Sequence, residues 1–396
     1  MILPKYLPLK LSGLLAAVAF AALAPLPSTE AAPANKSAAA TSPGQLLESE
    51  PLDSEFSLDQ AGKAFAIRYT STNGITGKGI VEVTGAIFLP KGKAPAGGWP
   101  IIAWAHGTVG VGDDCAPSAN PRSERDSTYL NSWLDQGYAI VATDYQGLGS
   151  PGPHPYLDTR AEAYSTLDSV RAALSGQYDL ANKVVIVGQS QGGGAAFATA
   201  GTAPQYAPDV HVLGTVATGL PNLEAAAAMT PSADDANKPD HRIAYLLYIA
   251  AAAEEIDPNI DPEKALTPKA MAVYDQATGT CIADMEKAVV DAGLTQTNSF
   301  KGDFWKRYGR TIANINYPTL QIATPVFVGT GADDIDTPAA AQTALVQKAC
   351  AAGSIIEAHV YPGLDHSGAV NGSFQDSRQF VARLLAGEKI AGNCPS

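Results

Sequence analysis

The chain has 396 residues, of which 46% are hydrophobic and 16% charged, a composition typical of a globular protein with one large domain and room for an insertion. Its 26 basic and 39 acidic residues give a formal net charge of −13, which argues against nucleic acid or an anionic membrane surface as a partner. The six histidines and four cysteines show no clustered metal-ligand spacing, so we expect neither a metal ion nor another cofactor.

The N-terminal segment has the pattern of a secretory signal peptide. Lys5 and Lys10 precede an apolar run from Leu11 to Leu26, and small residues follow. This run is shorter than the ~20 residues that span a bilayer, so we expect export to a secreted or periplasmic location rather than a stable membrane anchor. Residues 1–40 are therefore predicted to be a signal peptide and a flexible tail.

Two kinds of strand are predicted after this tail. Residues 65–90 contain stretches that alternate apolar and polar side chains, which is typical of half-exposed antiparallel strands. Short continuous apolar runs then alternate with helix-prone segments, which indicates parallel strands buried on both faces. The runs are 101–105, 138–143, 184–187, 212–217 and 325–328, and the helical segments are 127–136, 162–174, 193–203 and 337–352. The pattern predicts an α/β fold with a mostly parallel, doubly wound sheet.

One interval breaks this alternation. About a hundred residues separate the runs 212–217 and 325–328, which is far too many for a loop. They contain Ala-rich, helix-prone pieces separated by Pro and Asp, namely 223–229, 243–255, 268–275 and 282–292. We predict a helical cap at 221–320, inserted into a core made of 41–220 and 321–396.

The run 184–187 leads directly into Gly188-Gln-Ser190-Gln-Gly192, and two further glycines follow. A buried strand, a tight turn and small residues that open a helix are what a nucleophilic serine requires. The strained turn exposes the hydroxyl and leaves the next backbone N–H, that of Gln191, facing a developing oxyanion. We therefore predict Ser190 as a nucleophile.

The second oxyanion donor is expected in the loop after the first parallel strand. That loop reads His106-Gly-Thr108, and we assign the donor to the Thr108 amide because an unhindered glycine lets the backbone approach the oxyanion. His106 precedes the nucleophile along the chain, so we expect it to shape the loop rather than to act as the base.

An acid is expected between the nucleophile and the base, at the end of a strand. The turn Gly331-Ala-Asp-Asp334-Ile-Asp-Thr-Pro follows the run 325–328 and indicates Asp334 as this acid. Asp333 and Asp336 are the alternatives. The more ordinary interpretation of Asp336 is that it caps the helix that starts near Pro338.

The predicted base is His366, which follows an alternating run at 356–361 that should form the last strand. A neutral imidazole at this position would take the proton of the serine, and the acid would fix its tautomer. His154, His211 and His241 lie far from the relevant strand ends in the sequence. His359 lies inside the last strand and is expected to be structural.

The four cysteines predict disulfide bonds. Cys115, Cys281, Cys350 and Cys394 are an even number in a chain expected to be exported, so two disulfides are predicted, and three pairings are possible.

Several motifs together resemble the secretory lipase family, which consists of α/β-hydrolases of the lipase-A type from fungi and bacteria. They are the His106-Gly-Thr loop, Asp144-Tyr-Gln-Gly-Leu-Gly with His154-Pro-Tyr, the helix Leu167-Asp-Ser-Val-Arg-Ala-Ala, Gly188-Gln-Ser-Gln-Gly-Gly, Gly331-x-x-Asp and the final histidine. The resemblance covers about residues 45–396. It implies carboxylic-ester hydrolysis by Ser190, Asp334 and His366, a helical cap between the sixth and seventh core strands, and the disulfides Cys115–Cys281 and Cys350–Cys394.

These features predict a secreted serine hydrolase that cleaves carboxylic esters through an acyl-enzyme intermediate, acting on a small-molecule or lipid ester such as a triacylglycerol. Three alternatives stay open: an exported serine peptidase of the same fold, an esterase for short-chain, aromatic or polyester substrates, and a non-catalytic binding protein on the same scaffold. The last would predict a broken triad, and none of the three positions is broken.

Overall fold

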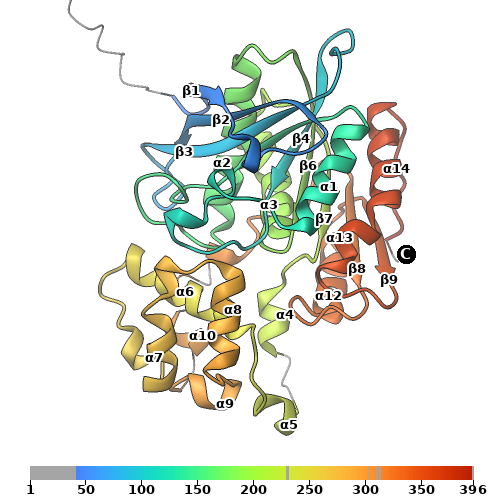
Figure 1. The fold of residues 1–396 in the computed structure, drawn as a ribbon. Coiled ribbons are helices and arrows are strands. Elements are labelled where there is room, and N and C mark those ends of the chain that lie inside the picture. The colour runs from blue at the N-terminus through green and yellow to red at the C-terminus, as the bar shows by residue number, and fades with distance from the viewer. Residues whose placement is uncertain (1–41, 229–231, 303, 309–310, 312–313, 395–396) are drawn as a thin grey trace, which may run out of the picture. The chain divides into compact units, whose positions relative to one another are not determined.

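The computed structural model describes residues 42–228, 232–302, 304–308, 311 and 314–394 (Figure 1). The predicted signal peptide and tail, residues 1–40, lie outside the described residues. Across the described ranges, no helix combines the length and the apolar character that a membrane crossing requires.

The described strands form one nine-stranded sheet in the order β1-β2-β3-β5-β4-β6-β7-β8-β9. Their bounds are β1 Leu46–Pro51, β2 Ala61–Thr72, β3 Ile80–Pro90, β4 Trp99–Ala105, β5 Ala139–Thr143, β6 Leu180–Gln189, β7 Val212–Thr218, β8 Val326–Gly331 and β9 Ile356–Tyr361. The pairs from β1 to β3, and β3 with β5, are antiparallel. All pairs from β5 to β9 are parallel. The mostly parallel sheet is therefore as predicted. The sequence does not predict β1, because every residue of this strand after Leu46 is exposed and gives no alternation.

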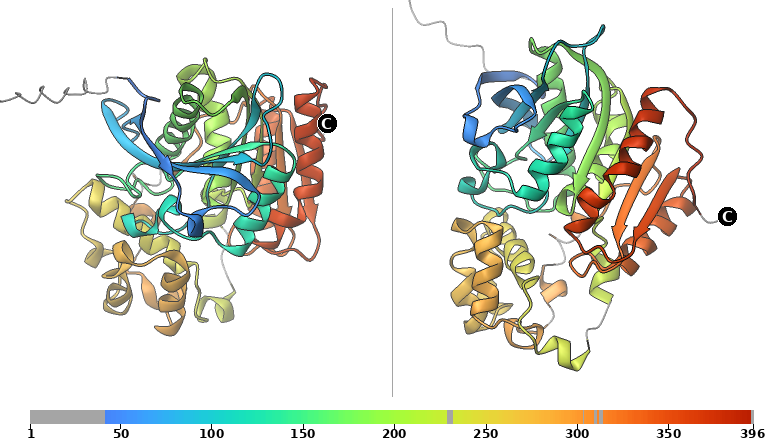
Figure 2. Two further views of the ribbon diagram at one scale, coloured as in Figure 1. Left: turned by 45° about the horizontal axis from the view of Figure 1, so that its top comes forward. Right: turned by 45° about the vertical axis from the view of Figure 1, so that its right-hand side comes forward.

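Helices cover both faces of the sheet (Figure 2). One face packs against α2 (Thr159–Ser175), α3 (Gln191–Tyr206) and α12 (Ala339–Ala351). The other face packs against α1 (Glu124–Asp135), the short α13 (Gly368–Gly372) and α14 (Phe374–Leu385). This arrangement explains the continuous apolar runs. In β4, for example, Ile101 and Ala103 face the first layer while Ile102 and Trp104 face the second.

Helix boundaries differ from the prediction where capping decides them. The first helix begins at Glu124, three residues before the predicted start at 127, because the Ser123 side chain accepts a hydrogen bond from the Asp126 amide. Helix α3 begins at Gln191 rather than 193, directly after Ser190. The chain therefore passes from strand to helix with a single residue between them.

The residues between β7 and β8 form helices with a core of their own. These helices are α4 Leu223–Ala228, α5 Ala233–Ala236, α6 Ile243–Ile256, α7 Pro268–Tyr274, α8 Ile282–Asp291, α9 Gln296–Ser299 and α10 Phe304–Arg307. Leu247, Tyr248 and Met285 are fully buried in this second core, which also packs on Tyr156 from the loop after β5. Figure 1 shows α6 to α10 gathered at one end of the sheet. The strands that flank this segment are β7 and β8, which are the sixth and the seventh when β2 is counted as the first strand.

Candidate active site

Ser190 occupies a strained turn at the end of β6. Its backbone angles are φ 57° and ψ −123°, a conformation that non-glycine residues rarely adopt. The neighbouring glycines permit this turn. A Cβ added to Gly188 would lie 1.9 Å from the carbonyl oxygen of Gly192, and one added to Gly192 would lie 1.9 Å from that of Ala105. The geometry is that of a nucleophile elbow.

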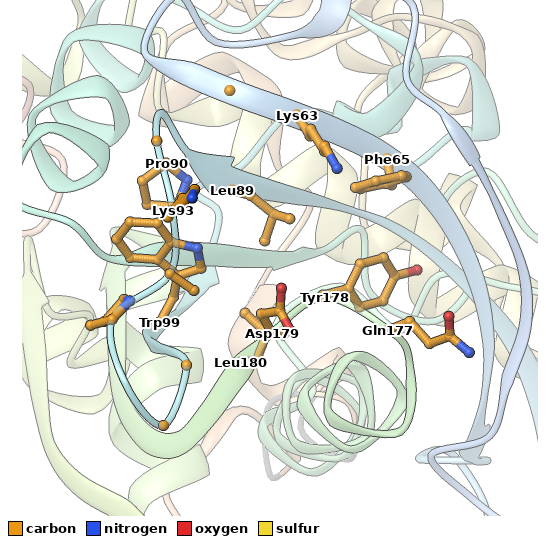
Figure 3. Close-up of a pocket in the computed structure, with 16 residues that line it drawn as sticks. Lys63, Phe65, Leu89, Pro90, Lys93, Trp99, Gln177, Tyr178, Asp179 and Leu180 are labelled. Atoms are coloured by element: carbon orange, nitrogen blue, oxygen red, sulfur yellow. The ribbon is translucent and has the colours of Figure 1, made fainter.

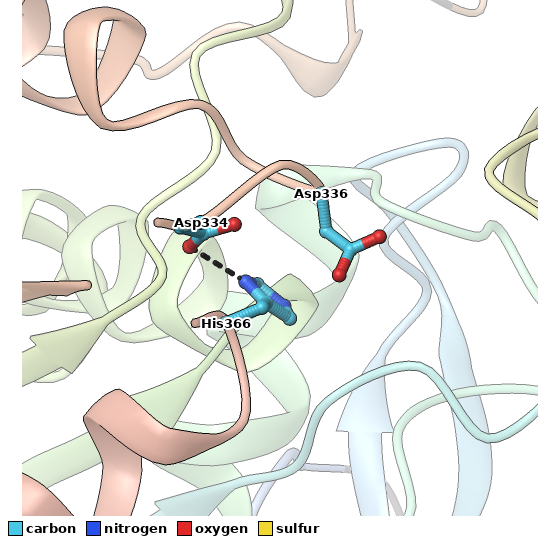
Figure 4. A group of neighbouring side chains, drawn as sticks. All are labelled: Asp334, Asp336 and His366. Carbon is cyan, nitrogen blue, oxygen red and sulfur yellow. Dashed lines mark hydrogen bonds and ion pairs between the residues drawn. The ribbon is translucent and has the colours of Figure 1, made fainter. Parts of the chain in front are cut away.

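Asp334 and His366 are hydrogen bonded to each other. The Nδ1 of His366 lies 2.8 Å from Oδ2 of Asp334 (Figure 4), and only 9% of the His366 side chain and none of the Asp334 side chain is exposed. Asp334 also accepts hydrogen bonds from the Thr337 amide, the Thr337 hydroxyl and the Gln342 side chain, each at 2.9 Å. With a carboxylate oxygen as the acceptor, Nδ1 of His366 is the donor in this bond, which leaves Nε2 as the acceptor nitrogen of a neutral ring.

Ser190 and His366 line the same cavity. In the described part of the chain, however, no hydrogen bond joins the Ser190 hydroxyl to the imidazole. The Nε2 of His366 instead lies 3.0 Å from the side-chain nitrogen of Gln189, the buried residue before the serine. The structure therefore brings the predicted acid and base into contact and places the predicted nucleophile in the same cavity, with Gln189 next to His366.

The two predicted oxyanion donors come from elements that meet beside Ser190. Gln191 is the first residue of α3, and its side chain donates to the buried carboxyl group of Glu162 at 2.8 Å. Thr108 lines the cavity with Ser190, and its hydroxyl lies 2.7 Å from that of Tyr156. Both residues are therefore held by side-chain contacts near the serine.

His106 has the loop-shaping contacts that the sequence predicts. Its Nδ1 lies 2.7 Å from the Gly107 carbonyl oxygen, and its Nε2 lies 3.2 Å from that of Asp144. Burial lowers the pKa of His106, and the two nearby carbonyl oxygens oppose the shift. A neutral imidazole has a single N–H and donates to only one of these oxygens, and its place between two loops makes it a structural element.

Two predictions about the surroundings are wrong. Asp336 does not cap α12, which has Pro338 at its N-cap and no side-chain cap. The Oδ1 of Asp336 lies 2.7 Å from Nε2 of His241, and both residues line the cavity of Ser190 and His366. His241, predicted to lie away from the site, is therefore part of it. No local pattern could have shown this, because His241 and Asp336 are 95 residues apart.

Two cavities meet at Ser190. One, of about 490 Å³, has an apolar side formed by residues such as Leu157, Leu246, Ile249 and Trp305. The other, of about 590 Å³, is lined by the charged or titratable residues Arg122, Arg125, Asp126, His241, Glu286 and His366. Thr108, Ser190, Tyr245 and Asp336 line both, whereas His366 lines only the second.

A further cavity of about 760 Å³ lies at the opposite ends of strands β4 and β6. It is lined by residues that include Lys63, Trp99 and Tyr178 (Figure 3). None of its lining residues belongs to the group around Ser190. It therefore adds nothing to the chemistry of the site.

Asp334, Asp336 and His366 could each offer one atom to a metal ion, because these atoms lie within 4.8 Å of one another. The Nδ1 of His366 and Oδ2 of Asp334 are already engaged with each other. The chemistry of the group is thus that of an acid–base pair.

Two disulfides are present, Cys115–Cys281 and Cys350–Cys394. Cys115 belongs to the loop after β4, and Cys281 directly precedes α8. This bond therefore ties the helices between β7 and β8 to the parallel sheet.

Comparison with known proteins agrees with this geometry. The family model described as "Secretory lipase" matches residues 122–366, a range that includes Ser190, Asp334 and His366. The chain belongs to the secretory lipase family.

The curated relatives of this chain are distant in sequence. The chain is 27% identical over 305 residues to the secreted triacylglycerol lipase LIP4 of Malassezia furfur, covering 72% of this chain and 55% of that protein. It spans about half or less of the length of the curated relatives it matches.

Solved structures confirm the α/β-hydrolase fold of this chain. The structure of Candida antarctica lipase A in its closed state has a TM-score of 0.70 at 21% identity, over 90% of this chain and 86% of that one. The rice cell wall degrading esterase LipA from Xanthomonas oryzae has a TM-score of 0.68 at 20% identity, over 88% of this chain and all of that one.

Proposed function

We propose that this secretory lipase is a serine carboxylic-ester hydrolase with Ser190 as nucleophile, His366 as base and Asp334 as the acid that orients the base. The observation that carries the proposal is the hydrogen bond between Asp334 and His366 in the cavity that also contains Ser190. The Nε2 of His366 takes the hydroxyl proton as Ser190 attacks the ester carbonyl carbon.

The tetrahedral intermediate then needs donors for its oxyanion. We assign this role to the backbone amides of Gln191 and Thr108, and losing one such donor costs ~3 kcal/mol of barrier. The protonated His366 gives its proton to the leaving alcohol. Water then attacks the acyl-enzyme by the same route and releases the carboxylic acid.

We assign the two halves of the ester to the two cavities from their lining residues. The leaving oxygen must lie next to His366, which lines only the charged cavity, so the alcohol part belongs there. The acyl part belongs in the apolar cavity beside Leu246, Ile249 and Trp305. This arrangement suits acyl esters of glycerol, and triacylglycerol is the substrate named for LIP4 of Malassezia furfur.

We further propose that residues 221–320 act as a cap on a core made of 41–220 and 321–396, because Tyr245, Leu246 and Trp305 of this segment line the cavities at Ser190. Export with removal of residues 1–40 is consistent with the two disulfides, which form and persist in oxidising compartments.

The triad is tested by variants with matched controls. Ser190→Ala should abolish hydrolysis of p-nitrophenyl esters and labelling by a fluorophosphonate. Ser132→Ala, in α1 but outside the lining of both cavities, should change neither. Asp334→Asn should lower kcat by ~10⁴-fold, because it favours the wrong tautomer of His366. Asp333→Asn removes the same charge from the exposed neighbouring residue and should leave kcat unchanged.

The substrate class is tested separately by measuring kcat/KM over acyl chains of different length and over matched amide substrates. Rates that rise with acyl length, with amides turned over far more slowly, are expected of an acyl-ester hydrolase. Undiminished ester turnover by Ser190→Ala would contradict the serine mechanism. Faster turnover of amides than of esters would instead indicate a peptidase.

A further inference from the structure

A second histidine–carboxylate pair lies beside the proposed base. Asp336 comes two residues after Asp334 on the loop that follows β8, and it contacts His241 as described above. It also lies near His366, because side-chain atoms of Asp334, Asp336 and His366 are all within 4.8 Å of one another (Figure 4). The imidazole of His366 therefore has two carboxylates near it.

This pair joins the proposed cap to the loop that carries the acid. His241 lies just before α6, and the following residue, Arg242, donates from its guanidinium to the Ile335 carbonyl oxygen at 2.9 Å. His241 and Arg242, directly before α6, thus contact Asp336 and Ile335 on the loop that follows β8.

The charges of the pair respond differently to pH. The hydrogen bond with Asp336 raises the pKa of His241 above its ordinary value of 6.5. Burial opposes ionisation of Asp336, but the hydrogen bond from His241 and the charge of His366 hold the pKa of Asp336 below its ordinary value. Asp336 therefore keeps its charge to lower pH than an ordinary carboxyl group, whereas His241 keeps its charge to higher pH than an ordinary imidazole.

Other charged or titratable groups near the pair are largely engaged elsewhere. Arg242 from the start of α6 forms an ion pair with Asp240, at 2.8 Å between Nε and Oδ1. Glu286 from α8 accepts a hydrogen bond from the Tyr245 hydroxyl of α6 at 2.7 Å. Apart from His366 itself, the variable charge beside Asp336 is thus that of His241.

We propose that Asp336 is a positioning residue that stabilises the protonated form of His366, and that His241 sets how much of the Asp336 charge reaches His366. The proposal rests on the proposed function, in which His366 takes the proton of Ser190. A carboxylate this close favours the imidazolium. A protonated His241 cancels much of this effect, and a neutral His241 restores it.

Substitutions of Asp336 and of His241 should therefore shift the acidic limb of the pH profile of kcat/KM in opposite directions. Asp336→Asn removes the negative charge, so the limb should move to lower pH by about half a unit to one unit, and the plateau should fall about three- to tenfold. His241→Gln keeps a donor for Asp336 but cannot become charged. Its limb should move to higher pH, in the opposite direction to that of Asp336→Asn. Asp333→Asn, on the same loop, is the matched control and should leave the profile in place.

The titration of the His366 ring, followed by NMR in the intact protein, gives a readout that does not need catalysis. The His366 pKa should fall in Asp336→Asn and rise in His241→Gln. An unchanged pKa, or shifts of the same sign in both variants, would overturn the proposal, and His241→Gln decides it alone if Asp336→Asn does not fold. If the unmutated protein had no esterase activity, the proposed function would be overturned, whereas the NMR result would still stand.

Discussion

The side-chain nitrogen of Gln189 lies 3.0 Å from Nε2 of His366, the atom that the proposed mechanism reserves for the proton of Ser190. Because Asp334 accepts the Nδ1 proton of His366, Nε2 is an acceptor and the Gln189 amide is the donor. In the proposed mechanism, Gln189 would therefore compete with Ser190 for Nε2 of His366.

Removing this donor should make the enzyme faster. Gln189→Met keeps the length of the side chain and frees Nε2, so kcat/KM for a p-nitrophenyl ester should rise about two- to tenfold, which corresponds to the net worth of about one neutral hydrogen bond. Gln189→Glu should act in the opposite direction, because a carboxylate beside Nε2 holds a proton on it. A slower Gln189→Met enzyme with an unchanged melting temperature would show that Gln189 assists the base.

The two disulfides should stabilise the fold by similar amounts but differ in their effect on substrate binding. Cys115–Cys281 closes a separation of 166 residues and Cys350–Cys394 one of 44, so the loss of chain entropy predicts roughly 5 and 4 kcal/mol. Thermal unfolding of C115A/C281A and C350A/C394A measures both effects. Only C115A/C281A should also raise KM, because only this bond ties α8 to the loop after β4. Equal KM values in the two variants would contradict that role.

The parallel sheet and the positions of the proposed triad could be predicted because both leave local signals. A strand buried on two faces is apolar throughout, as in residues 184–187, and a nucleophile elbow needs small residues around Ser190. Asp334 and His366 each follow a strand whose end lies at the same edge of the sheet. In contrast, the exposed strand β1 has no such pattern.

The contacts that surround the base could not be predicted from local patterns. His241 reaches Asp336 across 95 residues, and Gln189 reaches His366 across 177. Both depend on how chain segments that are distant in sequence pack together. Asp336 lies next to a helix start, which favours a capping role, although its contact is with His241 from the segment before α6.

The buried His154 should make the fold sensitive to acid. Burial lowers its pKa to about 4, while Nδ1 lies 2.9 Å from the Gln146 carbonyl oxygen. The unfolded chain binds this proton near pH 6.5 and the folded chain near 4, so stability falls by up to roughly 3 kcal/mol as pH drops through this window.

Unfolding by urea between pH 8 and 4 tests this prediction. His154→Asn keeps a donor for Gln146 and should flatten the dependence on pH, although the smaller side chain lowers stability by a constant amount. His211→Asn, at an exposed position, is the control and should keep the slope of the unmutated protein. Parallel curves for His154→Asn and the unmutated protein would contradict the role of His154.

Glu162 should have the opposite pH dependence. This carboxyl group is fully buried in the first turn of α2, and burial raises its pKa well above the ordinary value, with the hydrogen bond from Gln191 opposing the shift. Above about pH 4.5 the unfolded chain releases a proton that the folded chain retains, so stability falls as pH rises. Glu162→Gln should therefore raise the melting temperature at pH 8 and have little effect near pH 4.5. Glu124→Gln, in the exposed first turn of α1, should have no such effect.

Glu162 should also affect the proposed oxyanion site, through its hydrogen bond with the Gln191 side chain. Glu162→Gln keeps an oxygen that can accept the hydrogen bond of the Gln191 side chain, so kcat should stay within about threefold of the unmutated enzyme. Glu162→Leu leaves that amide buried without its partner, and a lost partner costs about 1–3 kcal/mol. Gln191 is the first residue of α3 and lies beside Ser190. Its unpaired side chain should therefore move, displace the proposed donor amide of Gln191 and lower kcat by at least tenfold. Equal kcat values for Glu162→Gln and Glu162→Leu, measured with one ester at pH 8, would separate Glu162 from the reaction.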